Sequence, residues 1–456
     1  MNPSPRSIAI LGAGVTGLTA AHRLARQGCA VRVFERGPRT GGAIGSELAE
    51  GWLVERGPNT VLESGLDMPA LIKELGLEGE RIEANATAKK RFIVRGGRAL
   101  ATPASPVSFF TTPLFSLGAK CRIMGEILAR PRVRPADVSL EELVRSHFGS
   151  EVVTYGLNPF VSGVYAGNAK KLSARHAFPT VWESERSHGS LIRGLLAGAK
   201  ARKARGEPRG RMVSFRRGLQ TLTDTLSGAL PTGTVTLNAR IEALIGSPCW
   251  TVVWSDGGAV HSEEFDLVLS ALPASGLASL RFGALGEQPL AAVEAIEQPP
   301  VASLFLGYRR DQVRHPLDGF GVLVPEVEKL SVLGVLFSST LFPGRAPEGH
   351  VALTVMAGGA RQPEVAMLEL PALLRRIQPD LVQLLGVTGE PLFLRHTLWP
   401  QAIPQYNLGY ERYFDTMNAA ETGHPGFLIG GQARDGIAVS ACIAAGEKLA
   451  RRALAA

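Results

Sequence analysis

The order of apolar and polar positions over the first part of the chain predicts a regular supersecondary unit. An apolar run at residues 8–11 is followed at once by a glycine-rich turn at residues 12–17, and apolar residues then recur at helical spacing as far as Gly28. A second apolar run at residues 30–34 ends on Glu35. Because apolar runs favour strands and a period of about 3.6 residues favours a helix, this order predicts strand, turn, helix and strand.

The glycine-rich turn has the spacing G-x-G-x-x-G in the context that a dinucleotide-binding fold requires. Gly12 would make the tight turn, Gly14 would let a pyrophosphate approach the backbone, and Gly17 would let helix and strand pack closely. Amide groups at the helix start would face the phosphates, and the Glu35 carboxylate would accept the ribose hydroxyls. A purely structural βαβ unit is the alternative interpretation.

The alternation of predicted strands and helices returns after residue 215, so we expect the first domain to be discontinuous. Residues 299–400 are rich in amphipathic strands, as in a sheet with one face toward a cavity. The other predicted elements are a hairpin at 88–100; helices at 109–129, 139–148, 191–205 and from 217; strands at 234–244, 250–254, 260–265, 267–271 and 427–429; and a helix at 437–454.

Composition places the chain among globular proteins. Its 456 residues leave room for two or three domains, and 45% hydrophobic with 20% charged residues argue against global disorder.

The four cysteines are scattered, which argues against a zinc site or a disulfide framework and fits a reducing compartment. The start of the chain lacks the apolar segment of a signal peptide. The longest uncharged stretch, residues 99–119, contains prolines and cannot form a spanning helix.

Much of the net charge of +8 lies between residues 193 and 217. No aromatic interleaving or nucleic-acid-binding motif accompanies these cations, so we favour an anionic membrane surface over nucleic acid. The helix at 191–205 carries leucines on one face and basic residues at its end, which suits a membrane interface. A solvated helix on a soluble domain is the alternative. The cations are Lys200, Arg202, Lys203, Arg205, Arg209, Arg211 and Arg216.

Several motifs resemble, in the same order, those of one flavoprotein family. Glu35 opens the spacing Glu-x-x-x-Arg-x-Gly-Gly, with Arg36 and Arg39 beside it and Gly42 at its end, which resembles the FAD signature of the amine oxidase and protoporphyrinogen oxidase superfamily. Further matches are the turn Gly57-Pro58-Asn59-Thr60, the stretch Val-Ser-Gly-Val-Tyr-Ala-Gly-Asn at 161–168, residues 319–325, and Trp399 shortly before Ile-Pro-Gln-Tyr. The chain is identified as similar to bacterial members of the oxygen-dependent protoporphyrinogen oxidase family. It departs from the family pattern at Arg434-Asp435 and at Ser440-Ala441.

The resemblance implies an α/β fold, α+β overall, in three parts. These are a Rossmann-like FAD-binding domain (residues 1–89, 211–282 and 401–456), a β-sheet substrate domain (90–106 and 283–400) and a helical membrane-binding insertion (107–210). FAD would be bound without a covalent link. The implied FAD contacts are Gly12, Ala13, Gly14, Val15, Thr16, Gly17, Glu35, Arg36, Arg39, Gly42, Gly57, Pro58, Asn59, Thr60, Ile241, Trp399, Ile437, Ala438 and Val439.

The activity implied by the resemblance is oxidation of the porphyrinogen protoporphyrinogen IX to protoporphyrin IX in haem biosynthesis, with molecular oxygen as acceptor and hydrogen peroxide released. No catalytic side chain and no metal is expected, because hydride transfer to a flavin needs orientation and exclusion of water more than a protein base. Arg91 would bind a propionate, Phe320 and Leu323 would sandwich a pyrrole ring, and Gly163 would let the macrocycle pass close to the backbone. The other implied lining residues are Phe160, Leu336 and Met356.

The sequence leaves three alternatives open. Coproporphyrinogen III oxidation would be favoured by extra cations at the cavity mouth, and an amine oxidase or carotenoid desaturase could use the same scaffold. A flavin-free binding protein would be recognised by its lack of colour. We expect a cytoplasmic protein attached peripherally to the cytoplasmic face of the cell membrane through residues 109–205, and a homodimer is compatible with this.

Overall fold

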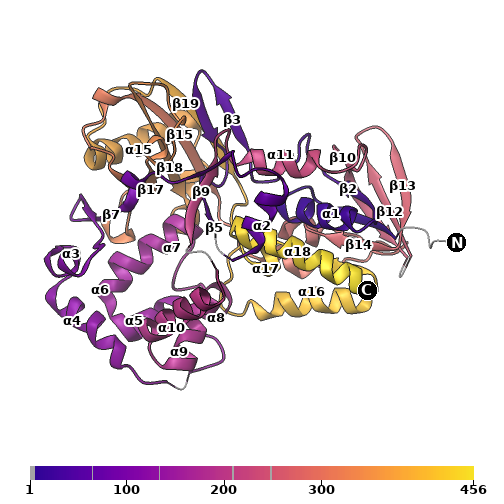
Figure 1. Cartoon of the computed structure of the whole chain (residues 1–456), viewed down its shortest axis with the longest axis horizontal. Coiled ribbons are helices and arrows are strands. Elements are labelled where there is room, and N and C mark those ends of the chain that lie inside the picture. The colour runs from indigo at the N-terminus through magenta and orange to yellow at the C-terminus, as the bar shows by residue number, and fades with distance from the viewer. Residues whose placement is uncertain (1–5, 64, 133, 208–209, 247–248) are drawn as a thin grey trace.

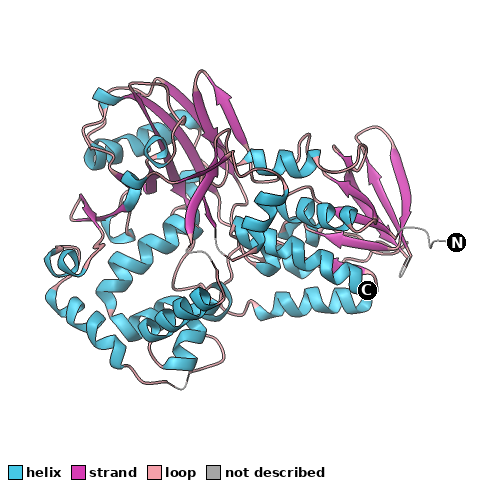
Figure 2. Ribbon diagram, viewed as in Figure 1, coloured by secondary structure: helices cyan, strands magenta, loops and turns pink. Residues whose placement is uncertain are grey.

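The computed structural model describes residues 6–63, 65–132, 134–207, 210–246 and 249–456. Figure 1 shows a parallel sheet with its helices on one side, a second sheet beside it, and a group of helices below that second sheet. Figure 2 shows the same division as a region rich in helices and two regions rich in strands. Arg209, predicted as part of the basic segment, lies outside the described residues.

The first sheet has five strands, and all of its pairings are parallel. Its order is β10 (Val235–Thr236), β2 (Ala30–Phe34), β1 (Ser7–Leu11), β14 (Leu267–Ser270) and β20 (Phe427–Ile429). Ile8 and Ile10 of β1 enter one hydrophobic cluster, and Ala9 and Leu11 enter another. The strand is therefore buried on both faces, which explains its continuous apolar run.

Helices cover one face of this sheet, and a small antiparallel sheet with two helices covers the other. The first layer contains α1 (Val15–Arg26), α2 (Asp67–Glu74), α11 (Gln220–Gly228) and α18 (Val439–Ala455). The second contains β11 (Arg240–Ile245), β12 (Trp250–Ser255), β13 (Val260–Phe265), α12 (Ala274–Ala278) and α16 (Glu411–Gly423). The predicted strand at 234–244 is wrong. β10 and β11 belong to different sheets, and the chain between them passes through Asn238 at φ +55°.

The second large sheet has seven strands and two different faces. Its order is β19 (Phe393–Trp399), β15 (Val301–Arg309), β18 (His350–Gly358), β17 (Val332–Leu336), β16 (Gly319–Leu323), β7 (Lys90–Arg95) and β8 (Arg98–Ala101). Leu353 and Val355 of β18 pack into the core that also holds α15 (Leu370–Leu385). Thr354 and Met356 point to the opposite face, because side chains alternate along a strand. The hairpin expected at 88–100 is confirmed as β7 and β8.

Short strands and helices connect these sheets. The hairpin of β3 (Ser46–Ala49) and β4 (Trp52–Glu55) and the small sheet β5–β9–β6 (Val61–Glu63, Arg211–Phe215, Arg81–Glu83) lie between the two large ones (Figure 1). The remaining short helices here are α13 (Ser338–Leu341), α14 (Pro363–Ala366) and α17 (Gln432–Asp435), with single turns at Ala86–Lys89, Ala291–Ala295, Arg310–Gln312, Glu326–Glu328 and Gly359–Arg361.

The third region is helical. It contains α3 (Pro106–Thr111), α4 (Leu117–Gly125), a turn at Glu126–Leu128, α5 (Leu140–Phe148), α6 (Ser150–Val152), a π-helical turn at Val153–Leu157, α7 (Asn158–Tyr165), α8 (Ala174–Ala177), α9 (Pro179–His188) and α10 (Leu191–Ala204). The continuous helix predicted at 109–129 is wrong. The chain leaves the helical conformation between Thr112 and Ser116, around Pro113, because proline cannot continue a helix. Among the described residues, no helix is both long enough and apolar enough to span a bilayer.

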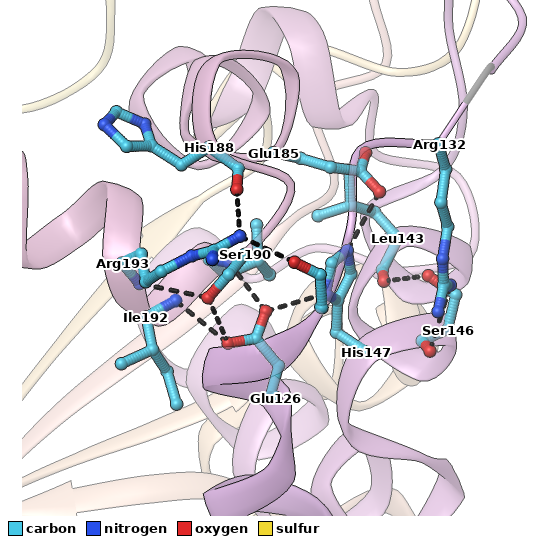
Figure 3. A network of polar contacts seen from close by, with 12 residues as sticks. Glu126, Arg132, Leu143, Ser146, His147, Glu185, His188, Ser190, Ile192 and Arg193 are labelled. Atoms are coloured by element: carbon cyan, nitrogen blue, oxygen red, sulfur yellow. Dashed lines mark hydrogen bonds and ion pairs between the residues drawn. The ribbon is translucent and has the colours of Figure 1, made fainter.

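A buried polar network fixes the start of α10 (Figure 3). The carboxylate of Glu126 accepts hydrogen bonds from the amides of Leu191 (2.6 Å) and Ile192 (3.1 Å) and from the Ser190 hydroxyl (2.8 Å). The ring of His147 lies between Glu126 and Glu185, with one nitrogen 2.7 Å and the other 2.8 Å from a carboxylate oxygen. The carboxylate thus supplies acceptors for amides that have no partner within the helix. The network thus connects the start of α10 to α5 and α9.

Candidate functional site

The turn between β1 and α1 has the geometry that its glycines predict. Gly12 adopts φ +97°, and its amide donates to the Phe34 carbonyl at 2.8 Å. A Cβ on Gly17 would overlap the carbonyl oxygen of Gly12, so the helix approaches the turn as closely as backbone allows. A Cβ on Gly14 would meet nothing within 4 Å. The face of the turn at Gly14 is therefore open, and the first amides of α1 lie next to it.

A second backbone segment comes close to this open face. The Gly41 amide donates to the Ala13 carbonyl at 2.8 Å, and a Cβ on Gly42 would lie 3.3 Å from the Gly14 Cα atom. Arg39 holds the segment in place, since its guanidinium donates to the carbonyls of Ile44 (2.7 Å) and Gly42 (3.0 Å). The predicted cation is thus fixed beside the glycine turn by hydrogen bonds to the backbone.

Glu35 lies at the end of β2, where the sequence predicts an acceptor. Its Oε2 atom accepts from the Ala13 amide at 2.9 Å and its Oε1 atom from the Gly37 amide at 2.8 Å. Each carboxylate oxygen can accept a further hydrogen bond, so both remain usable for ribose hydroxyls. Ile241 comes from the neighbouring β11 and is partly buried against the hydrophobic cluster that contains Ala9 and Leu11. Arg36 is exposed.

The turn at residues 57–60 lies against both the glycine segment and the seven-stranded sheet. A Cβ on Gly57 would overlap the Ala43 carbonyl oxygen, and it would lie 3.7 Å from the ring of Trp399, whose indole donates to the Arg56 carbonyl at 3.0 Å. The Asn59 amide group donates to the Gly57 carbonyl at 3.2 Å. Thr354 of β18 donates to the Asn59 side-chain oxygen at 3.1 Å. The turn, with Pro58 and Thr60 half-buried, therefore joins the two large sheets.

The start of α18 lies beside the start of α1. The Thr16 hydroxyl donates to the Cys442 carbonyl at 3.0 Å, and a Cβ on Gly446 would crowd the Thr16 carbonyl. Ala438 precedes the first turn of α18, and Ile437 and Val439 flank it, so the free amides of this turn have the same positive character as those of α1. The predicted residues of the two helices are thus brought together.

The loop before α18 is fixed by Tyr406. Its hydroxyl donates to the Gln432 carbonyl at 2.5 Å and accepts from the Gly436 amide at 3.0 Å. Burial raises the pKa of Tyr406, which keeps the hydroxyl protonated and able to donate. Arg434 and Asp435, where the sequence departs from the family pattern, both form ion pairs. Arg434 contacts Glu421 at 3.2 Å, and Asp435 contacts Lys448 of α18.

These residues fit a dinucleotide with an anionic pyrophosphate. Two helix N-termini converge, the backbone at Gly14 and Gly42 carries no side chain that would occupy the space, and a carboxylate stands where a ribose would lie. The turn at Gly57 extends the same surface toward the seven-stranded sheet, so the reactive end of a long cofactor would reach that sheet.

The face of the seven-stranded sheet next to Asn59 is apolar and partly open. Leu323, Leu336 and Met356 are each half-buried within strands that are otherwise almost fully buried. The register pairs Leu323 with Gly334, Gly334 with Met356, and Leu336 with Thr354, so all three side chains lie on the face that carries Thr354. The structure therefore brings these three predicted lining residues together beside the turn that contacts Asn59.

Arg91 and Phe320 form a pair at the edge of this face. Arg91 is exposed, and its guanidinium carbon lies 5.3 Å from the centre of the Phe320 ring. Phe320 packs with Leu336 against a small hydrophobic cluster formed by β6, the turn at Ala86–Lys89 and the end of α13. The neighbouring Lys90 is paired with Asp318. Arg91 is thus a cation held by an aromatic ring at the margin of an apolar surface.

Helix α7, which carries Phe160 and Gly163, packs on part of the same surface through Gly163. A Cβ on Gly163 would overlap the side chain of Leu323, so the glycine allows α7 to pack closely on β16. The group that lies close to the Gly163 backbone in this structure is the side chain of Leu323. Phe160 is 41% exposed and belongs to a group of rings with Tyr165 and Phe178.

The sequence did not single out two buried charges below the turn at residues 57–60. Glu55 ends β4, and Arg345 comes from the loop after α13; both are buried, and they contact each other at 3.2 Å. The only sequence signal for Glu55 is its place just before the Gly-Pro turn, and Arg345 has no motif around it.

Comparison with known proteins gives consistent matches over nearly the whole chain. A family model described as flavin containing amine oxidoreductase matches residues 15–454. The chain is 34% identical to protoporphyrinogen oxidase 2, chloroplastic/mitochondrial, of Arabidopsis thaliana, over 98% of this chain and 93% of that relative. It is 27% identical to coproporphyrinogen III oxidase of Bacillus subtilis (strain 168), over 100% of this chain and 99% of that relative.

Solved structures match over the same extent. A crystal structure from Exiguobacterium sp. 255-15, provisionally assigned as a protoporphyrinogen oxidase, superimposes with a TM-score of 0.82 at 22% identity and covers 98% of each chain. A putrescine oxidase bound to putrescine gives a TM-score of 0.70 at 18% identity, over 99% of each chain. At these identities the structures support the fold, and the predicted mixed α/β architecture is confirmed.

Proposed function

Because the chain belongs to the flavin-containing amine oxidoreductase family and is an FAD-dependent oxidoreductase, we propose that it oxidises protoporphyrinogen IX to protoporphyrin IX with molecular oxygen as acceptor. Six electrons and six protons leave the substrate in three rounds, and three oxygen molecules take them up as hydrogen peroxide. The flavin supplies the acceptor for each two-electron step. In the proposed division of the chain, residues 1–89, 211–282 and 401–456 bind FAD, 90–106 and 283–400 bind the substrate, and 107–210 dock on a membrane.

The observation that carries the proposal is the apolar sheet face beside the turn at residues 57–60. A porphyrinogen is a large macrocycle with an apolar body, and such a ligand is bound mainly by apolar side chains with a few polar groups for orientation. Leu323, Leu336 and Met356 offer that surface, and the contact between Thr354 and Asn59 joins it to the proposed cofactor turn. These residues would orient the macrocycle and exclude water from the reacting carbon.

The pair of Arg91 and Phe320 supports a substrate that is apolar in its body and acidic at one edge. A pyrrole ring would lie against Phe320, and a propionate would meet the guanidinium above it. Arginine is well suited to this role because its planar fork binds a carboxylate through two hydrogen bonds.

Peripheral membrane attachment forms the second part of the proposal, and exposed apolar side chains of the helical region support it. Leu117 is 74% exposed, Leu128 79% and Leu196 61%, and they come from α4, the turn after it, and α10. The exposed cations Lys200, Arg202 and Lys203 end α10. By contrast, Arg211 pairs with Glu83 on β6, so this cation of the predicted basic segment belongs to a different surface. An interface of apolar side chains with neighbouring cations suits anionic lipids.

Coproporphyrinogen III is the second candidate substrate, because relatives named for either activity cover the chain. A tetracarboxylate would require more cations at the edge of the apolar face than a dicarboxylate. Of the cations next to Arg91, Lys90 is already neutralised by Asp318. This favours the dicarboxylate, protoporphyrinogen IX.

Steady-state turnover with both porphyrinogens tests the proposal. We expect kcat/KM to be higher for protoporphyrinogen IX, with one peroxide formed for each two electrons removed. A clear preference for coproporphyrinogen III would replace the substrate assignment, and absence of turnover with both, in protein that carries FAD, would overturn the proposed reaction.

A further inference from the structure

Helix α7 lies across one end of the seven-stranded sheet. It contacts β16 and β17, and the π-helical turn before it contacts β7. A Cβ on Gly163 would overlap the side chain of Leu323 and would lie 3.9 Å from the Leu333 carbonyl oxygen. Leu323 ends β16, and Leu333 is the second residue of β17. Gly163 therefore marks the side of α7 that faces the sheet.

The two flanks of α7 face in opposite directions. On one flank, the Asn158 side-chain oxygen accepts from the Glu326 amide at 2.8 Å, and the side-chain nitrogen donates to the Glu326 carboxylate at 3.3 Å. Glu326 follows β16, so this flank points past the end of the sheet. At about 100° per residue, Phe160 and Val164 lie roughly 60° and 100° around the helix axis from Gly163, on the side away from Asn158. Their flank therefore points back over the apolar sheet face.

Both side chains on this second flank are apolar and open. Phe160 is 41% exposed and Val164 48%, whereas Ser162 on the other flank is buried. The chain has no charged residue between Glu151 and Lys170. The flank formed by Phe160 and Val164 thus offers an apolar surface, and α7 adds no charge to it.

The cation of the proposed substrate site lies at the other end of the same sheet face. Arg91 lies over Phe320, near the start of β16, whereas Gly163 packs on Leu323 at the end of that strand. Three residues of a strand span about 10 Å. The face is therefore bounded by a cation at one end and by the apolar flank of α7 at the other.

We propose that Val164, together with Phe160, determines substrate specificity by receiving the edge of the macrocycle that carries no carboxylate. The inference rests on the proposed function and adds the orientation of the substrate on the sheet face. Protoporphyrinogen IX carries its two propionates on neighbouring pyrroles and uncharged vinyl groups on the other two. The propionate edge lies at Arg91, and the vinyl edge lies against α7.

The apolar flank discriminates against a second pair of carboxylates. Coproporphyrinogen III carries propionates where protoporphyrinogen IX has vinyl groups. Moving a carboxylate from water onto an apolar surface without a partner costs free energy, and α7 carries no cation that could pair with it. A vinyl group, by contrast, gains free energy when the same surface covers it.

Charged substitutions of Val164 test the inference through kcat/KM for the two porphyrinogens. Val164→Lys should raise the ratio of coproporphyrinogen III to protoporphyrinogen IX efficiency roughly tenfold or more, because a hydrogen bond to a charged group contributes at least this factor. Val164→Glu should lower the ratio below that of the wild type. A mere disturbance of the helix would move both variants in the same direction. Most of the change should appear in KM, because these substituents are remote from the reacting carbon.

Val382→Lys is the matched control. Val382 is a valine of α15 with 49% exposure, and α15 packs on the opposite face of the sheet. The variant adds the same charge at a similar exposure and should keep the wild-type ratio. An unchanged ratio in Val164→Lys, a shift of the same sign in Val164→Glu, or an equal shift in Val382→Lys would overturn the inference.

Binding of the two product porphyrins, followed by their fluorescence, gives a second readout that needs no turnover. Val164→Lys should bind coproporphyrin III more tightly relative to protoporphyrin IX, by a factor similar to that in kcat/KM, and wild-type relative affinities in this variant would contradict the inference. A wild-type protein that oxidises neither porphyrinogen would overturn the proposed function alone. Porphyrin binding would then decide the role of Val164.

Discussion

Replacing Arg91 with alanine removes the guanidinium that lies over Phe320 at the edge of the apolar sheet face. Arg91 is exposed, its guanidinium carbon is 5.3 Å from the ring centre, and the adjacent Lys90 is already engaged with Asp318. The guanidinium is therefore oriented by the ring before substrate arrives. If it binds a propionate, the substitution removes a charge-assisted contact without exposing any core residue.

The magnitude follows from the strength of such a contact. A hydrogen bond to a charged group contributes about 1.5–3 kcal/mol. At about 1.4 kcal/mol for each factor of ten, this corresponds to roughly a 10- to 150-fold loss in kcat/KM. Because the propionate is remote from the reacting carbon, most of the loss should appear in KM. Arg91→Lys should recover only part of the efficiency, since an ammonium group lacks the planar fork.

Steady-state kinetics with anaerobically prepared protoporphyrinogen IX measure this effect. Lys90→Ala is the matched control, because it removes a neighbouring cation that is already neutralised, and it should change kcat/KM little. Flavin content should be the same in all variants, because Arg91 does not belong to the cofactor site. An Arg91→Ala enzyme with wild-type efficiency would refute the reasoning and leave Arg91 as a surface cation.

Three further substitutions test other parts of the account. Gly17→Ala should abolish FAD retention, because the new Cβ would overlap the Gly12 carbonyl; flavin absorbance relative to protein in the purified variant measures this. Leu128→Glu combined with Leu196→Glu should reduce flotation with anionic liposomes while turnover in detergent is kept; unchanged flotation would contradict the proposed membrane face. Glu126→Gln should lower the free energy of unfolding by about 1–3 kcal/mol, because the amide has one acceptor oxygen fewer and leaves a buried donor at the start of α10 without a partner; denaturant unfolding measures this, and an unaltered midpoint would contradict the structural role.

The parts of the site that local spacing determines could be predicted from the sequence. The contacts of Gly12, Gly17 and Glu35 all arise within one strand–turn–helix–strand unit, where sequence distance fixes spatial distance. The motif resemblance extended this to Gly57 and Trp399, which lie far apart in the chain yet meet at the same turn. The β-hairpin before residue 101 was also predicted correctly, because its turn carries the glycines that a reversal needs.

Features that depend on packing between distant segments could not be predicted. The contact of Glu55 with Arg345 joins residues 290 positions apart, and neither has a local pattern that reveals its burial. The side chain of Leu323 lies against Gly163 because α7 packs on β16, which periodicity within either element does not disclose. The reversal at Asn238 also escaped the apolar pattern, since one positive φ angle divides two strands that look continuous in sequence.

Anaerobic reduction of the bound flavin by protoporphyrinogen IX tests the central claim most directly. The holoenzyme is mixed with the substrate in the absence of oxygen, and the visible absorbance of the flavin is recorded before and after air is admitted. We predict loss of the oxidised flavin spectrum on mixing, followed in air by its return, formation of protoporphyrin IX and release of hydrogen peroxide. A flavin that stays oxidised in the presence of the porphyrinogen would contradict the account.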